Sequence, residues 1–160
     1  MPEAFDIAET EAPLRPQAAS ESVREFLTFS VGGEAFGVPL TEVLEILGVR
    51  TVTPVPRSPA DVVGVCTVRG ELVTVINTGR RLKVRSAPAR LAGRILLTST
   101  REGEKVGLMV DEVLGVQRFA ESQIESTASA LVADISSHIE SIGRSDGQVT
   151  VLVNLRSLTT

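Results

Sequence analysis

The stretch GEAFGVPLTEVL at residues 33–44 returns as GEKVGLMVDEVL at residues 103–114, with six of twelve positions identical and no gap. A second match follows at a similar offset, where GELVTVIN at residues 70–77 aligns with GQVTVLVN at residues 147–154. Both halves of the chain therefore run through a hairpin, a short helical or bent element and another hairpin in the same order. This collinear repetition indicates one structural unit used twice, and chance similarity between hairpins is the alternative.

Short apolar segments separated by turn residues fill most of both halves and predict β-hairpins. The turn residues are Gly32-Gly33, Arg69-Gly70, Glu102-Gly103 and Asp146-Gly147. Apolar residues at helical spacing between Leu40 and Leu47 predict a helical turn that leads into a strand. The sequence thus predicts a mainly β protein that contains two similar small barrels.

Composition divides the chain into a tail and a folded domain. Residues 1–23 are rich in Ala, Glu, Pro and Ser and show no sustained periodicity, which predicts a disordered tail. The folded domain is expected at residues 24–160, with a first barrel half at about 24–88 and a second at about 89–160. This pattern leaves open an exchange of strands between the barrels.

The bulk composition excludes several classes of protein. The chain has 42% hydrophobic residues and a mean hydropathy of +0.19, which suffices for a core. Its formal charge of -4 argues against general nucleic-acid binding, which depends on cationic contacts to phosphate. One cysteine cannot form an internal disulfide, and neither a long apolar span nor a leader pattern is seen. We therefore expect a cytoplasmic protein without direct membrane insertion.

The sequence offers little for catalysis, which needs groups that exchange protons or attack near neutral pH. There is one His and one Cys, too few for a usual zinc site, and no glycine-rich phosphate loop. Ser137 and His138 are adjacent and would point to opposite faces of a strand. Cys66 alternates within an apolar strand and is expected in the core, and Asp111-Glu112 is expected on the solvated surface. We predict a protein that is not an enzyme and holds no cofactor or metal.

Two cationic features could serve binding. Arg80, Arg81 and Lys83 begin a basic run to residue 94 that contains no acid and no aromatic residue on which nucleic-acid bases could stack. The run is interpreted as a solvated connection or as a docking surface for an acidic partner, with nucleic acid or anionic lipid as a further alternative. Arg69, on a turn between apolar strands, is either a solvated turn residue or an interface residue, since guanidinium groups suit protein interfaces.

Four segments occur in order along the chain: FLTFSVGGEAFGVPLTEVLEI, PVPRSP, GVCTVRGELVTVIN and KVGLMVDEVLGV. Together they closely resemble the CheW family of coupling proteins in bacterial chemosensory signalling, over about residues 25–158. The resemblance implies two five-stranded β-barrels, SH3-like or OB-like, with short helical turns and a hydrophobic groove between them. It also implies a non-catalytic adapter that joins the regulatory domain of a CheA-type histidine kinase to the cytoplasmic tips of chemoreceptors.

Two sets of interaction residues follow from the resemblance by motif. A receptor-binding groove is implied by matches to the family's VQEI segment and to valines of the second barrel: Val43, Glu45, Val110, Val113 and Val116. Contacts with kinase or receptor are implied by matches to a family glycine and to the family's NLRG turn: Gly64, Arg69 and Gly70.

The chain departs from the family pattern in two places. NLRG reads TVRG here, with Thr67 in place of Asn, and VDLR reads INTG at residues 76–79, which loses an acid and an Arg that Arg80 or Arg81 could replace. These changes bear on kinase contacts more than on the fold. They make an adapter from a gliding or pilus motility pathway one expectation, and a receptor-binding decoy without kinase binding another. An adapter of this kind is expected to be recruited to membrane receptor arrays.

Overall fold

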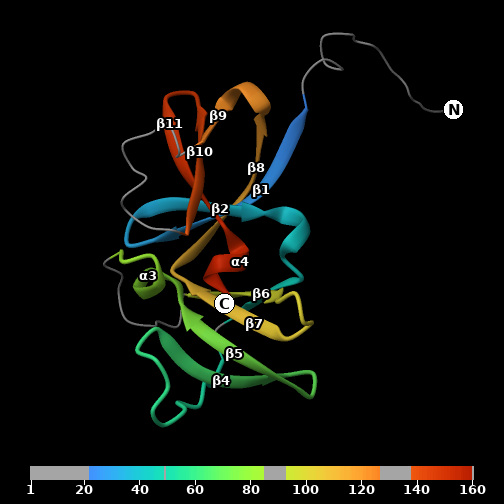
Figure 1. Cartoon of the computed structure of the whole chain (residues 1–160), viewed down its shortest axis with the longest axis vertical. Helices are drawn as coiled ribbons and strands as arrows, with labels where there is room; N and C mark the ends of the chain where they lie inside the picture. The colour runs from blue at the N-terminus through green and yellow to red at the C-terminus, as the bar shows by residue number, and fades with distance from the viewer. Residues whose placement is uncertain (1–21, 49, 85–92, 127–137, 160) are drawn as a thin grey trace, which may run out of the picture.

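The computed structural model describes residues 22–48, 50–84, 93–126 and 138–159. Strands dominate these residues, and single helical turns join some of them (Figure 1). The strands are β1 (Val23–Val31), β2 (Glu34–Pro39), β3 (Glu45–Gly48), β4 (Val62–Val68), β5 (Glu71–Asn77), β6 (Arg94–Ser99), β7 (Lys105–Val110), β8 (Glu112–Ala120), β9 (Ile124–Ser126), β10 (Ile139–Ser145) and β11 (Gln148–Val153). The helical turns are η1 (Leu40–Glu42), α3 (Thr78–Arg81), η2 (Glu121–Gln123) and α4 (Leu155–Leu158). The prediction of a mainly β protein is confirmed.

The strands form two sheets, and each sheet curls into a barrel. One sheet has five strands in the order β3-β6-β7-β5-β4, and the other has six in the order β8-β1-β2-β11-β10-β9. In the six-stranded sheet, β8 and β9 lie at opposite edges although only the three residues of η2 separate them, so the sheet must close on itself. In the five-stranded sheet, Thr53 follows β3 and pairs with Val65 on the opposite edge strand β4. One barrel has the expected five strands, and the other has a sixth because η2 interrupts its bent strand.

The repeat in the sequence is a repeat of structure. β4 begins at Val62 and β10 at Ile139, and α3 begins at Thr78 and α4 at Leu155, a shift of 77 residues in both cases. Each helical turn is also capped in the same way, because the side chain of the preceding asparagine accepts backbone N–H groups. The unit that is used twice therefore ends in an Asn-capped helical turn.

The first hairpin of each repeat lies in the barrel of the other repeat. β1 and β2 sit between β8 and β11, and β6 and β7 sit between β3 and β5, with β2 parallel to β11 and β5 parallel to β7. Each barrel therefore contains strands from both sides of the boundary near residues 88 and 89, an exchange that the sequence pattern left open. The two repeats exchange their hairpins.

The two barrels share one large core. This cluster joins Phe29 and Phe36 of the six-stranded barrel with Leu96 and Leu108 of the five-stranded barrel, and Leu158 of α4 is fully buried in it. Smaller clusters fill the inside of each barrel. Burial of this apolar surface is the main stabilising contribution, and it holds the barrels together.

Three hairpin turns have positive φ at both central residues: φ is 61° and 82° at Gly32-Gly33, 49° and 84° at Arg69-Gly70, and 52° and 79° at Asp146-Gly147. This pairing is typical of type I′ turns, which match the twist of the flanking strands. Glycine and aspartate tolerate positive φ, whereas arginine rarely adopts it. The Arg69 backbone is therefore held in an unfavourable conformation.

The ends of several elements differ from the sequence expectation. β1 begins at Val23, so the last residue of the expected tail belongs to a strand, while residues 1–21 lie outside the described residues. The apolar spacing between Leu40 and Leu47 corresponds to the short turn η1 and then to β3.

Among the residues that the structure describes, no helix is long and apolar enough to cross a membrane.

Candidate functional site

Arg69 and Glu45 form a two-pronged ion pair on the surface of the five-stranded barrel. Arg69 lies on the β4–β5 turn and Glu45 begins β3, so the pair joins the two edge strands of that sheet. Arg69 Nη1 donates to Glu45 Oε2 at 3.2 Å, and Nη2 donates to Oε1. The hydrogen bond from Arg69 lowers the pKa of the Glu45 carboxyl. Exposed pairs add little stability, so the geometry mainly orients two charged groups at the surface.

Gly64 is required by the backbone that supports this turn. Its φ is +154°, and a Cβ placed on it would lie 2.2 Å from the carbonyl oxygen of Thr53. Thr53 in turn exchanges two backbone hydrogen bonds with Val65, at 2.8 and 2.9 Å, and these bonds close the barrel. Gly64 therefore acts through the barrel wall, while Gly70, with φ +84° and open space around it, serves the turn itself.

The predicted groove valines fall into two groups. Val43 and Val113 are partly buried and pack against the shared core, and Val110 is buried within that core at 2% exposure. Val116 on β8 is 54% exposed and is available to a partner. The structure thus brings Val43, Val110 and Val113 to one core cluster.

Three further apolar residues near these valines are exposed. Leu44, just before β3, is 53% exposed, Ile46 on β3 is 45% exposed, and Leu114 on β8 is 51% exposed. β3 and β8 are edge strands of their sheets, and edge strands carry unpaired backbone groups that favour association. The sequence of β8, EVLGVQRFA, does not alternate apolar and polar residues, so it carries no signal that singles out Leu114 as exposed. The exposed set at β3 and β8, here named the apolar rim, comprises Leu44, Ile46, Leu114 and Val116.

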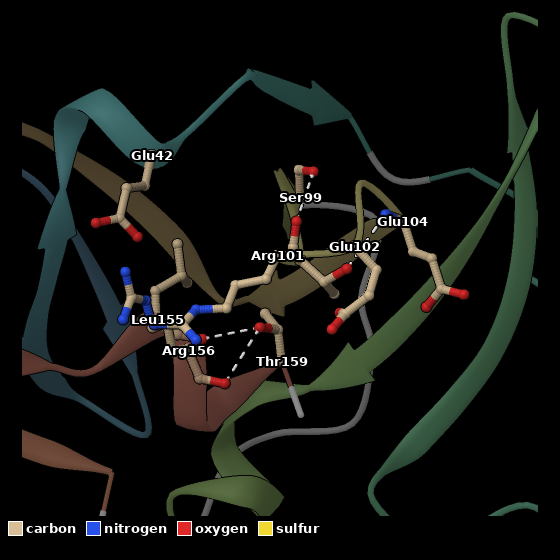
Figure 2. A pocket seen from close by; sticks show the side chains of 9 residues that line it. Glu42, Ser99, Arg101, Glu102, Glu104, Leu155, Arg156 and Thr159 are labelled. Atoms are coloured by element: carbon tan, nitrogen blue, oxygen red, sulfur yellow. Dashed lines mark hydrogen bonds between the residues drawn. The ribbon is translucent and has the colours of Figure 1, made fainter.

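Two hollows flank η1, and Glu42 lines both of them. The larger has a volume of about 690 Å³ and lies between η1, the β6–β7 turn and α4. Figure 2 shows the Arg101 side chain extending from the β6–β7 turn towards α4. Glu42 of η1 lies across the hollow from α4. Acidic and basic side chains mix on its walls, so it lacks the apolar lining that is usual for a small-molecule site.

The basic run does not present its three cations alike. Arg80 and Lys83 are exposed, whereas the Arg81 side chain is only 14% exposed. Arg81 Nε donates to the carboxylate of Asp61, and Nη1 donates to the carbonyl oxygen of Leu158 at 2.7 Å. Arg81 is therefore occupied within the protein, which leaves Arg80 and Lys83 as the exposed cations of this predicted surface.

The remaining reactive residues have structural surroundings. Cys66 is buried in the five-stranded barrel, and burial raises the pKa of its thiol. His138 lies just before β10 with Nδ1 2.7 Å from Ser157 Oγ, while Ser136 and Ser137 lie outside the described residues. Asp111, expected on the solvated surface, accepts the backbone N–H of Gly32 at 2.8 Å and so ties a hairpin turn to the end of β7. Within the described parts of the chain, no group of three or more His, Cys, Asp or Glu residues could hold a metal ion.

The departures at residues 76–79 have a local explanation. Asn77 accepts the N–H of Arg80 at 3.0 Å and caps α3, a role that asparagine and aspartate fill about equally well. Thr78 is completely buried, and its hydroxyl has no hydrogen-bond partner among the described residues. The change from an acid to Asn77 is therefore neutral for the fold, whereas the buried hydroxyl of Thr78 lowers the free energy of unfolding.

Comparison with known proteins identifies the architecture. A solved structure titled scaffolding protein TtCheW from Thermoanaerobacter tengcongensis superposes with a TM-score of 0.78 and 25% identity, covering 86% of this chain and 92% of that one. The chemotaxis protein CheW of Rhizobium meliloti is 31% identical over 84% of this chain and 86% of its own length. Protein FrzA of Myxococcus xanthus is 37% identical over 71% of each chain.

The double barrel, together with these similarities, defines an adapter protein of chemosensory signalling. Residues 25–160 match the CheW-like domain, and the chain belongs to that family. The resemblance drawn from the sequence motifs is confirmed. Nucleic-acid or lipid binding through residues 80–94 is not favoured by these relationships.

Proposed function

We propose that this adapter couples a CheA-type histidine kinase to the cytoplasmic tips of chemoreceptors and performs no reaction itself. The proposal is supported by family membership and by surface chemistry at β3 and β8. An amphipathic receptor helix could place apolar side chains on the apolar rim, since helices bind apolar surfaces in this way. In this role the protein works in the cytoplasm and is recruited to membrane receptor arrays by its partners.

The ion pair between Arg69 and Glu45 is the observation that carries the proposal. It holds a guanidinium with 68% exposure beside β3, which carries the apolar rim residue Ile46 and directly follows Leu44. Charged groups at the edge of an apolar contact add specificity and orientation more than affinity. Arg69 and Gly70 are accordingly proposed to contact kinase or receptor, with Val43, Glu45 and Val113 at the receptor side and Val110 beneath them.

Capture of partners by the purified protein tests this function. The wild-type protein should retain both a kinase regulatory-domain fragment and a receptor-tip fragment, each expressed separately. Arg69→Ala should weaken capture by about tenfold or more if Arg69 is an interface hot spot. Arg144→Ala is the matched control, because Arg144 also forms an exposed ion pair, with Glu125 on the six-stranded barrel. Normal capture by a folded Arg69→Ala variant would contradict the assignment.

The same experiment separates the adapter from the decoy. Retention of the receptor fragment alone would identify a receptor-binding decoy, whereas retention of both fragments supports the adapter.

The similarity to FrzA is compatible with a specialised motility pathway, such as one for gliding or pili. Pull-down with paired kinases and receptors from flagellar and other motility systems would decide the pathway, since the cognate pair should bind most tightly.

A further inference from the structure

Arg81 makes polar contacts that span the two repeats. Its side chain begins in α3, which follows β5 of the five-stranded barrel, and it ends at the Leu158 carbonyl in α4, which follows β11 of the six-stranded barrel. Leu158 is the residue equivalent to Arg81 in the second repeat, 77 positions later. The contact therefore joins matching positions of the two units.

Asp61 accepts a second hydrogen bond from Arg81, at Nε. Asp61 precedes β4, and its backbone carbonyl also accepts the N–H of Asn77, the N-cap of α3, at 2.8 Å. An ion pair with little exposure and a further hydrogen bond is a well-defined geometry for an arginine, whose planar fork donates in fixed directions. Arg81 thus has a defined direction towards α4.

α4 needs such a contact because it is only four residues long. Its backbone is held by hydrogen bonds from Leu158 N to Asn154 O at 3.2 Å and from Thr159 N to Leu155 O at 3.0 Å. A single helical turn is intrinsically unstable without tertiary contacts. The burial of Leu155 and Leu158 supplies apolar contacts, and Arg81 supplies a charged donor to a carbonyl at the helix end.

α4 also forms a wall of the larger hollow. Leu155, Arg156 and Thr159 line that hollow opposite Glu42 of η1 (Figure 2). Glu42 is followed directly by Val43 and the apolar rim residue Leu44. A shift of α4 would therefore change the surface next to the proposed receptor side, although Arg81 itself would touch no partner.

We propose that Arg81 is a positioning residue: it clamps α4 to α3 and thereby sets the shape of the receptor-side surface beside η1. This inference rests on the proposed function for its effect on receptor binding, and on the contacts of Arg81 alone for its effect on α4. It assigns Arg81 a role different from that of a docking cation.

Hydrogen exchange on the full-length protein without partners tests the clamp. Arg81→Met should speed exchange at the Leu158 and Thr159 amides by about tenfold or more, because a charge-assisted hydrogen bond to their helix is lost. Arg81→Lys keeps the positive charge but loses the planar guanidinium and its two separate donors. It should therefore give an intermediate increase in the exchange rates. Arg80→Met removes a neighbouring exposed charge and should leave both amides at the wild-type rate. Unchanged exchange in Arg81→Met, or equal increases in Arg80→Met, would overturn the clamp.

Affinity measurements on the same variants test the effect on the receptor side. Arg81→Met should weaken binding of the receptor-tip fragment by about tenfold and leave kinase-fragment binding within about twofold, a split that general destabilisation would not produce. Equal loss of both partners, or a larger loss in Arg80→Met, would contradict positioning and favour a docking surface. If the wild-type protein binds neither fragment, the proposed function fails, while the exchange experiment still decides whether Arg81 clamps α4.

Discussion

The carbonyl oxygen of Thr53 occupies the space in which a side chain on Gly64 would lie, 2.2 Å from the ideal Cβ position. The approach is this close because Thr53 pairs with Val65 to close the five-stranded barrel. A family glycine that the motif assigns to partner contact is thus first of all a requirement of the barrel wall.

Gly64→Ala should lower the free energy of unfolding by at least about 2 kcal/mol, because the methyl group forces Thr53 away and φ +154° is unfavourable for alanine. Urea denaturation followed by circular dichroism measures the change. Gly48→Ala is the control, since a Cβ at Gly48 meets nothing within 4 Å, and it should be nearly neutral. Equal urea midpoints for the two variants would contradict this prediction, because they would show that the backbone near Gly64 can shift to accept a Cβ atom.

Arg69→Gly should separate stability from binding. Glycine relieves the unfavourable φ of 49°, and the exposed ion pair that is lost contributes little. The thermal midpoint should therefore equal or exceed that of the wild-type protein, while capture of partners falls. Asp146→Gly, at the equivalent turn of the other barrel, should leave capture unchanged. A marked drop in the melting temperature of Arg69→Gly would mean that the ion pair is structural.

Thr78→Val should stabilise the protein by about 1 kcal/mol, because it keeps the shape of the side chain and removes a buried hydroxyl that finds no hydrogen-bond partner in the part of the chain that the structure describes. Thr98→Val is the matched comparison: Thr98 is equally buried, but its hydroxyl donates to the Val106 carbonyl at 3.1 Å. That variant should be destabilised by about 1 kcal/mol. Urea unfolding of both proteins gives the sign, and destabilisation by Thr78→Val would reveal a partner for that hydroxyl.

His138 should make stability depend on pH. Burial and then the charge of Arg81 lower the pKa of His138 below its ordinary value of 6.5. The unfolded chain therefore binds a proton at His138 more readily than the folded protein does. The contribution of neutral His138 to the free energy of unfolding is complete above pH 6.5, and it is lost as pH falls through the lower pKa of the folded state. Between pH 8 and pH 5, the unfolding free energy of the wild-type protein should fall relative to that of His138→Asn. A constant difference across this range would exclude the effect.

Local sequence signals predicted the hairpins and the duplication because turn chemistry is a property of adjacent residues. The pairs Gly32-Gly33 and Asp146-Gly147 accept the backbone of a type I′ turn, and they mark it wherever the strands later pair. The exchange of hairpins could not be predicted in this way. Gly37 and Gly107 occupy matching positions in similar hairpins, so the local pattern does not distinguish pairing within a repeat from pairing across repeats.

The site was predicted in part for a similar reason. Arg69 and Glu45 followed from motif matches, and the structure brings them into contact although they are 24 residues apart. Arg81 was grouped with docking cations because its partners lie 20 and 77 residues away, beyond any local pattern. Val110 was placed in the groove, yet its side chain is buried, because the alternation of a strand identifies two faces without saying which one meets the shared core.

The exchanged hairpins make the molecule indivisible. A chain that ended after α3 would contain β3, β4 and β5 without the β6–β7 hairpin that completes their barrel. Its own β1–β2 hairpin would lack β8 and β11, the strands with which it pairs. Two such half-chains could supply each other with the missing strands, as in a domain-swapped dimer. The present fold has the strand arrangement of such a dimer within one chain, so neither repeat can form its barrel without the other.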